Sequence, residues 1–238
     1  MGSSSAKRIQ TSILNAAEKK VLIKIANRLP AWVTSDSLTW TGVIGAIICA
    51  VGYALSAINM QYLWISSFGL FVNWFGDSLD GTLARVRNTQ RPTYGFYIDH
   101  ALDAFTITIM CAGAGLSPLF TPTIGLLVLA AYLVLSIHTY LLTILKNEFV
   151  LTYGGLGPTE FRLVMVIMNT VAIYVPWQSC ILHIFGTDFN IFQLLGIAIV
   201  ILLWTMNVVN FWRDLGYFAK KDPVKPFNPG KNDMKPEK

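Results

Sequence analysis

Apolar residues form six long runs along the chain, separated by short polar stretches. The runs cover about residues 38–57, 62–85, 94–116, 119–145, 157–177 and 189–217. A helix needs about 20 apolar residues to cross the hydrocarbon layer. Pro30, Pro118 and Pro158 stand near the ends of runs, where a helix tolerates proline. The pattern predicts an all-α integral membrane protein with six transmembrane helices.

The segment before the first run has a different pattern. From Ala6 to Leu29, apolar residues recur at every fourth position from Ile9 onward, and the lysines and Arg8 lie off that stripe. A single apolar stripe on a charged helix is typical of a helix that lies in the membrane interface. We therefore expect an amphipathic interfacial helix ahead of the six spans.

Composition and charge support a membrane protein. Hydrophobic residues make up 54% of the chain and charged residues 13%, whereas about a quarter of a soluble domain is charged. All 18 Lys and Arg fall before the first run, near the second–third and fourth–fifth connections, or after about Phe211. The positive-inside rule places these regions, both termini included, in the cytoplasm. Attraction to anionic headgroups explains the net charge of +5, so we expect membrane lipids and no nucleic acid as partners.

Four aspartates interrupt the second and third runs. Asp77 and Asp80 lie three residues apart, and Asp99 and Asp103 lie four apart. An ionisable side chain near the membrane centre costs on the order of 2.5–3.5 kcal/mol on insertion scales, so function must offset it. These spacings put each pair on one helix face. Because the connection between the runs is short, the two helices are antiparallel neighbours and the four carboxylates can converge.

Converging carboxylates repel one another unless cations lie between them. An all-carboxylate set suits hard ions such as Mg²⁺ or Mn²⁺, and four carboxylates can hold two ions. Gly81, Ala84 and Gly95 leave room for a ligand along the same faces, and Arg85 is placed to meet a phosphate. The pattern favours a metal-dependent enzyme. A cation transporter or channel that uses the aspartates as its ion site is the alternative.

The residues from Asp77 to Asp103 read Asp-x2-Asp-Gly-x2-Ala-Arg-x9-Gly-x3-Asp-x3-Asp. This motif resembles the signature of the CDP-alcohol phosphotransferase family, and the six-span layout behind an amphipathic helix is similar to that family too. One departure is the spacer from Val86 to Tyr94, which has nine residues where eight are usual. The resemblance implies transfer of a phosphoalcohol group from a CDP-alcohol to an acceptor alcohol, with release of CMP, in phospholipid-type lipid synthesis.

The resemblance also implies a role for each residue of the motif. Asp77, Asp80 and Asp99 would hold metal beside the CDP pyrophosphate. Asp103 would be the general base and would also touch the metal. A homodimer is a further expectation from the family alone. The residues that would line the cytidine nucleotide are Gly81, Ala84, Arg85 and Gly95.

Two branches of the family stay open for the substrates. One uses CDP-diacylglycerol with a polar acceptor, and the other uses CDP-choline or CDP-ethanolamine with a lipid acceptor. His100, between Asp99 and Asp103, and the stretch Gly157-Pro158-Thr159-Glu160 resemble elements of the second branch. These two cues do not decide between the donors.

The chain is expected to divide into three parts. Residues 1–33 would form the amphipathic juxtamembrane helix and its lead-in, residues 34–218 the six-span catalytic membrane domain, and residues 219–238 a polar cytoplasmic tail. The active site would face the cytoplasm with both termini.

Several polar residues outside the motif allow two interpretations each. Glu160 and Arg162 could order the acceptor or form a charged cap at the membrane edge. His138 could support the base or be a hydrogen-bonded packing residue. Asp36 or Ser37 is expected to be the N-cap of the first span rather than a nucleotide contact.

Overall fold

The computed structural model describes residues 7–9, 15–146, 148–150, 157–177, 181–184 and 186–224. These residues form long helices with a few very short strands, which confirms the all-α prediction. The helices are α1 (Asn15–Ala26), α2 (Ser35–Leu55), α3 (Leu63–Val86), α4 (Pro92–Gly115), α5 (Pro122–Lys146), α6 (Pro158–Tyr174) and α7 (Ile191–Lys221), with a 3-10 turn η1 (Met60–Tyr62). The strands are β1 (Lys7–Ile9), β2 (Glu148–Val150), β3 (Ile181–Ile184) and β4 (Thr187–Asn190).

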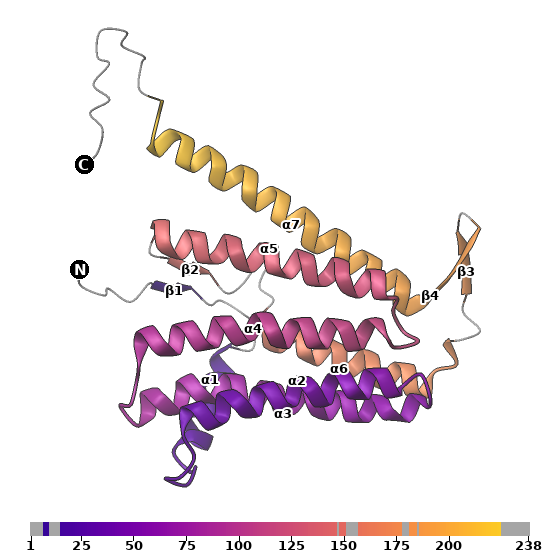
Figure 1. Cartoon of the computed structure of the whole chain (residues 1–238), viewed down its shortest axis with the longest axis horizontal. Coiled ribbons are helices and arrows are strands. Elements are labelled where there is room, and N and C mark those ends of the chain that lie inside the picture. Colours follow the sequence, from indigo (N-terminus) through magenta and orange to yellow (C-terminus); the bar gives the residue numbers. More distant parts are fainter. Residues whose placement is uncertain are drawn as a thin grey trace, which may run out of the picture.

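Each of the six apolar runs contains one long helix, α2 to α7. These helices contact one another in the spatial order α6, α3, α2, α4, α5, α7, and Figure 1 shows α5 and α7 on the opposite side of α4 from α2 and α3. Within the described residues, α2, α5 and α7 are long and apolar enough to cross a membrane. α3 and α4 carry the aspartates, and α6 has 17 residues. The findings support an integral membrane protein, and the count of six spans stays a prediction.

The described residues of the amino-terminal segment differ in part from the expected helix. A helix was predicted from Ala6 to Leu29, but α1 covers only its second half, and Lys7–Ile9 form β1, which pairs in parallel with β2. The prediction is wrong over β1, where pairing with a distant segment gives the backbone partners that a helix would otherwise supply. Leu22 of α1 is buried in a cluster that includes Leu79 of α3. The place of α1 in the membrane interface stays a prediction.

The carboxyl-terminal end also differs slightly from the expected division. α7 continues to Lys221, three residues beyond the expected end of the membrane domain at residue 218. Residues 225–238 of the expected tail lie outside the described residues. β3 and β4 form an antiparallel hairpin before α7, with Gly186 at its turn at a φ of 77°.

α2 and α3 pack backbone to backbone. A Cβ atom placed on Gly45 would lie 2.3 Å from the backbone nitrogen of Asn73, and one on Gly76 would lie 2.3 Å from that of Gly42. Small residues at a helix interface allow this close approach in membrane proteins. The contact fixes the half of α3 that carries its aspartates against the first half of α2.

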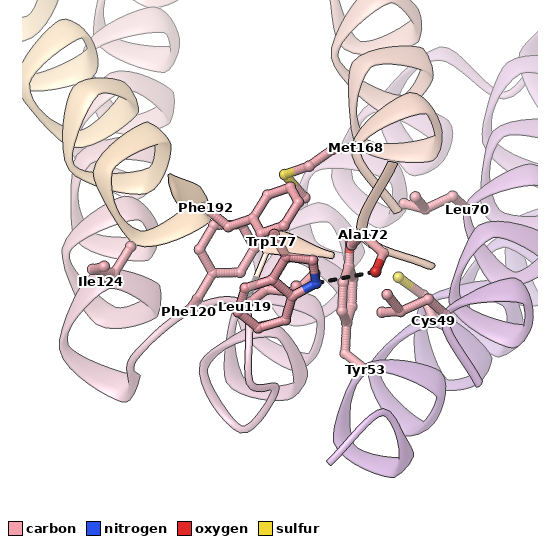
Figure 2. Packing of buried hydrophobic residues seen from close by; sticks show 11 residues of the cluster. Cys49, Tyr53, Leu70, Leu119, Phe120, Ile124, Met168, Ala172, Trp177 and Phe192 are labelled. Carbon is pink, nitrogen blue, oxygen red and sulfur yellow. Dashed lines mark hydrogen bonds between the residues drawn. The ribbon is translucent and has the colours of Figure 1, made fainter. Parts of the chain in front are cut away.

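The main hydrophobic core lies at the other end of these helices. Figure 2 shows Trp177 and Phe192 packed together, with ring centroids 5.4 Å apart. Trp177 Nε1 also donates a hydrogen bond of 3.0 Å to the backbone oxygen of Ala172. Tyr53 of α2 donates a 3.0 Å hydrogen bond to Asn169 of α6. The core therefore joins α2, α6 and α7 away from the aspartates.

Replacing Gly45 with alanine should destabilise the α2–α3 pair, because the added methyl group would meet the backbone of Asn73. Overpacking of this kind costs about 1–3 kcal/mol, which thermal unfolding in detergent would record as a lower Tm. The matched control is Gly216→Ala in α7, where the added carbon meets no heavy atom of the described residues within 4 Å. Equal Tm values for the two variants would contradict a backbone contact at Gly45.

Candidate functional site

α3 and α4 bring three of the four predicted aspartates together. Asp77, Asp99 and Asp103 each offer a carboxylate oxygen, and these oxygens lie within 4.8 Å of one another. Asp77 comes from the second half of α3, and the other two come from the first half of α4. The short connection makes the helices antiparallel, but the expectation that they are direct neighbours is wrong. α3 and α4 each pack mainly on α2 rather than on each other, and their acidic side chains meet beside α2.

Asp80 lines the same cavity, but its carboxylate is held by other groups. One carboxylate oxygen, Oδ2, accepts a 2.7 Å hydrogen bond from Thr39 Oγ1 of α2. The other, Oδ1, accepts a bond from the backbone nitrogen of Gly81. Ser35 Oγ of α2 donates to the backbone oxygen of Asp80 at 2.9 Å. Asp80 is thus tied to α2 beside the three converging carboxylates.

The N-cap of α2 is Thr34, the residue directly before the helix. Thr34 has an extended backbone, and its side chain accepts a 3.1 Å hydrogen bond from the backbone nitrogen of Ser37. Ser37 Oγ accepts in return from the backbone nitrogen of Thr34 at 3.0 Å. The predicted N-cap at Asp36 or Ser37 is therefore wrong, because both residues lie inside the helix and the N-cap is the extended residue before it, with Ser37 as its partner in the capping box. Asp36 instead pairs with Arg91 at 3.4 Å.

Arg162 of α6 contacts Asp77, one of the three converging aspartates. Its Nη2 atom donates to Asp77 Oδ2 at 2.7 Å, and its Nε atom donates to Asn73 Oδ1 at 3.0 Å. Asn73 in turn donates to the backbone oxygen of Gly42 at 3.0 Å. The sequence interpretations of Arg162, ordering of the acceptor or a charged cap at the membrane edge, did not include this contact with Asp77. The sequence could not pair Arg162 with Asp77, since 85 positions separate them.

Glu160 and His138 have structural partners. Glu160 Oε2 accepts a 3.0 Å hydrogen bond from the backbone nitrogen of Gly157 and so caps α6. His138 Nε2 lies 2.9 Å from Asp214 Oδ2, and Lys146 donates to the other oxygen of Asp214 at 2.7 Å. These contacts favour a helix cap for Glu160 and a hydrogen-bonded packing role for His138.

His100 lies beside two carboxylates, although the sequence presented it only as a cue to a branch of the family. Its Nδ1 atom is 3.7 Å from Asp99 Oδ2 and 4.0 Å from Asp103 Oδ2. The ring stacks on Tyr140 of α5 at 5.1 Å and meets Phe96 edge-on at 4.2 Å. The aromatic neighbours hold the imidazole beside both carboxylates, at distances longer than a hydrogen bond. Its position three residues before Asp103, on the same helix face, is the signal that could have identified it.

Gly81 and Gly95, the two glycines expected near the nucleotide, are not packed against another helix as the glycines between α2 and α3 are. A Cβ on Gly95 would meet no heavy atom of the described residues within 4 Å, and one on Gly81 would meet only the guanidinium of Arg85, at 3.5 Å. Packing within the described part of the chain therefore does not require glycine at either position, and the space beside the backbone is open to a ligand. Arg85 is exposed, donates to Thr82 Oγ1 at 3.0 Å and lies next to the partly buried Ala84.

Of the nine-residue spacer Val86–Tyr94, only residues 87–91 lie between α3 and α4, and Arg87 anchors this connection to the residues just before α2. Arg87 donates to the backbone oxygens of Val33, Leu29 and Pro30 at 2.5, 2.9 and 2.9 Å. Asn88 adopts a φ of 55°, in the left-handed region that asparagine tolerates better than most residues. The connection between α3 and α4 is thus held against residues 29–33, which precede α2.

The aspartates surround a cavity of about 20 Å³. Its walls come from α2, α3 and α4, and include Thr39, Asn73 and all four motif aspartates. A volume of about 10–15 Å³ holds one water molecule, so the cavity has room for a small cation that the carboxylates bind directly. The donor set is entirely oxygen, which fits Mg²⁺ or Mn²⁺. Repulsion among the carboxylates gives a cation a direct electrostatic reason to bind.

A model of the CDP-alcohol phosphatidyltransferase family matches residues 32–212, which include the whole site. The chain belongs to the CDP-alcohol phosphatidyltransferase family. It is 25% identical to cholinephosphotransferase 1 of Danio rerio over 197 residues, which are 77% of this chain and 50% of that protein. It is also 36% identical to phosphatidylinositol phosphate synthase of Cutibacterium acnes over 112 residues, which are 43% of this chain and 51% of that protein. The chain thus spans about half the length of these curated relatives.

In this family member, Asp99→Asn should weaken Mn²⁺ binding by at least about tenfold, because losing even an outer-shell partner commonly costs that much. The free Mn²⁺ signal in electron paramagnetic resonance measures the affinity of the purified protein. Asp188→Asn is the matched control, since Asp188 lies in β4, is exposed and pairs with His183. Equal affinities for both variants would remove Asp99 from the metal site.

Proposed function

We propose that this protein transfers a phosphoalcohol group from a CDP-alcohol to an acceptor alcohol, releasing CMP, in the synthesis of a phospholipid-type lipid. The observation that carries the proposal is the convergence of Asp77, Asp99 and Asp103 within 4.8 Å in a chain whose family match spans residues 32–212. The names of the relatives, a cholinephosphotransferase and a phosphatidylinositol phosphate synthase, support this reaction class. They leave open whether the donor resembles CDP-choline or CDP-ethanolamine, or is CDP-diacylglycerol.

The proposed cofactors are two divalent ions, Mg²⁺ or Mn²⁺. Asp77, Asp80, Asp99 and Asp103 would hold them: Asp77, Asp99 and Asp103 offer oxygens within 4.8 Å of one another, and Asp80 lines the same cavity. When bound, such ions neutralise phosphate charge and make a coordinated hydroxyl more acidic. The nucleotide would lie along the open backbone of Gly81 and Gly95, beside the residues Ala84 and Arg85.

Asp103 is the proposed general base. It would accept the proton of the acceptor hydroxyl, whose oxygen would then form a bond to the phosphorus that carries the donor alcohol. The bond between this phosphorus and the bridging oxygen of CMP would break, and CMP would leave with that electron pair. Proximity supports this role, since holding reactants together removes much of the entropic barrier. His100 lies 4.0 Å from Asp103, where it could help to orient the carboxylate.

The proposed setting is a six-span membrane domain over residues 34–218, with α1 in the interface and a polar tail over residues 219–238. The six long helices α2 to α7 support this arrangement. Within the described residues, three of them have the length and composition expected of a membrane span. The one-sided distribution of Lys and Arg supports cytoplasmic termini and a cytoplasmic active site. A homodimer is proposed from the family alone.

The direct test is CMP release by the purified protein. CDP-choline and CDP-ethanolamine would each be paired with diacylglycerol, and CDP-diacylglycerol with a small polyol phosphate, with the product identified by mass. One pairing should release CMP, EDTA should abolish release, and Mg²⁺ or Mn²⁺ should restore it, because the carboxylates need a cation. No CMP from any pairing, or full activity in metal-free buffer, would contradict the proposal. Mn²⁺ transport into protein-containing vesicles would favour the transporter alternative.

Asp103→Asn tests the assignment of the base. The substitution keeps the shape of the side chain and removes the proton acceptor, so turnover should fall by about 10²–10⁴-fold. CDP-alcohol affinity, measured by calorimetry, should change little. Asp80→Asn should instead weaken metal and nucleotide binding together, because it damages the ligand set itself. If Asp103→Asn kept near-normal turnover, or lost nucleotide affinity as severely as Asp80→Asn, Asp103 would be a ligand or packing residue and not the base.

A further inference from the structure

One carboxylate oxygen of Glu18, in α1, accepts hydrogen bonds from two other helices. Trp74 Nε1 and Ser78 Oγ of α3 donate to Glu18 Oε1 at 2.7 and 3.2 Å. Thr159 Oγ1 of α6 donates to the same oxygen at 2.8 Å. Hydrogen bonds to a charged acceptor are roughly twice as strong as neutral ones. Glu18 is therefore a junction of α1, α3 and α6.

This junction lies next to the aspartate site along both helices. Ser78 directly follows Asp77 in α3, and Thr159 precedes Arg162 by three residues in α6. Arg162 joins the same two helices a second time through its 2.7 Å bond to Asp77. Trp74 and Thr159 can both reach Glu18 only when α3 and α6 lie at one particular distance. At that same distance the Arg162 guanidinium contacts the Asp77 carboxylate.

The surroundings of Glu18 set it apart from the other charges of α1. Lys19, Lys20 and Lys24 are exposed, whereas Glu18 is partly buried and aims its carboxylate into the bundle. Moving a carboxylate out of water is costly unless hydrogen bonds replace the lost hydration. Here Trp74, Ser78 and Thr159 replace it, so the pairing depends on the positions of all three donors.

We propose that Glu18 is a positioning residue of the candidate active site: it fixes α3 against α6 at the spacing where Arg162 meets Asp77. This inference rests on the proposed function. It makes α1 a structural part of the site, in addition to any attachment of α1 to the membrane. Glu18 touches no reacting group and acts through the Arg162–Asp77 pair.

The first measurement follows the docking of α1 without using activity. Glu18→Ala removes the acceptor, so trypsin should cleave after the exposed Lys24 several-fold faster than in the unmodified protein. Glu18→Gln keeps an acceptor oxygen and should restore most of the protection. Val21→Ala is the matched control in α1, because Val21 is 50% exposed and lies outside the junction. Unchanged cleavage of Glu18→Ala would overturn the junction itself.

The second measurement asks whether Glu18 acts through Arg162. Mn²⁺ affinity, read by electron paramagnetic resonance, should fall roughly tenfold in Glu18→Ala, as for the loss of an outer-shell partner. Glu18→Gln should recover most of the affinity, and Val21→Ala should keep it. The Glu18→Ala and Arg162→Ala double variant should be no worse than Arg162→Ala alone, because residues that act through one pair are not additive. Additive losses would overturn the positioning role.

Kinetics separate this role from a general loss of structure. Glu18→Ala should raise the Mg²⁺ concentration needed for half-maximal CMP release and lower kcat, while the KM for the acceptor stays near that of the unmodified protein. An equal change in all three parameters would contradict the proposal. If the unmodified protein released no CMP, the proposed function would fail, whereas the proteolysis and Mn²⁺ results would still decide the role of Glu18.

Discussion

Mutual repulsion among carboxylates inside a helical bundle is the constraint that organises this structure. Two unit charges 4.8 Å apart repel by about 3–4 kcal/mol at an effective dielectric constant of about 20. The packing of α3 and α4 on α2 keeps Asp77, Asp99 and Asp103 at this spacing, and the Arg162 guanidinium, 2.7 Å from Asp77, offsets part of the repulsion. The glycines between α2 and α3 and the short α3–α4 connection supply that restraint, and the hydrophobic core around Trp177 closes the other end of the bundle.

The groups around the aspartates divide into two kinds. α3 and α4 supply the acidic side chains, whereas α2 and α6 supply the groups that orient them. Thr39 of α2 holds Asp80, and Arg162 of α6 holds Asp77. The acidic side chains thus come from two helices adjacent in sequence, while the contacts that orient them come from α2 and from the distant α6.

The parts of the structure that the sequence predicted are those that depend on local pattern. Hydropathy located each long helix to within a few residues, and spacings of three and four placed each aspartate pair on one face. The contacts it did not predict join distant segments, such as Glu18 with Thr159, 141 positions apart. The strand β1 escaped prediction for the same reason, because its partner β2 lies equally far along the chain. Thr34 was missed as the cap because several nearby residues can cap a helix, and the backbone decides among them.

Asp214 of α7 is a buried acidic residue outside the aspartate site, and its carboxylate is surrounded by donors. Its side chain is 7% exposed, and both carboxylate oxygens receive donors from neighbouring cationic or ionisable side chains. These donors are Lys146, His138 and Arg213. The motif aspartates Asp77, Asp99 and Asp103 are 30%, 44% and 38% exposed, and turn toward one another around a shared cavity. The bundle surrounds Asp214 with donors but brings Asp77, Asp99 and Asp103 together. Negative charge is therefore concentrated where a bound cation would be stabilised.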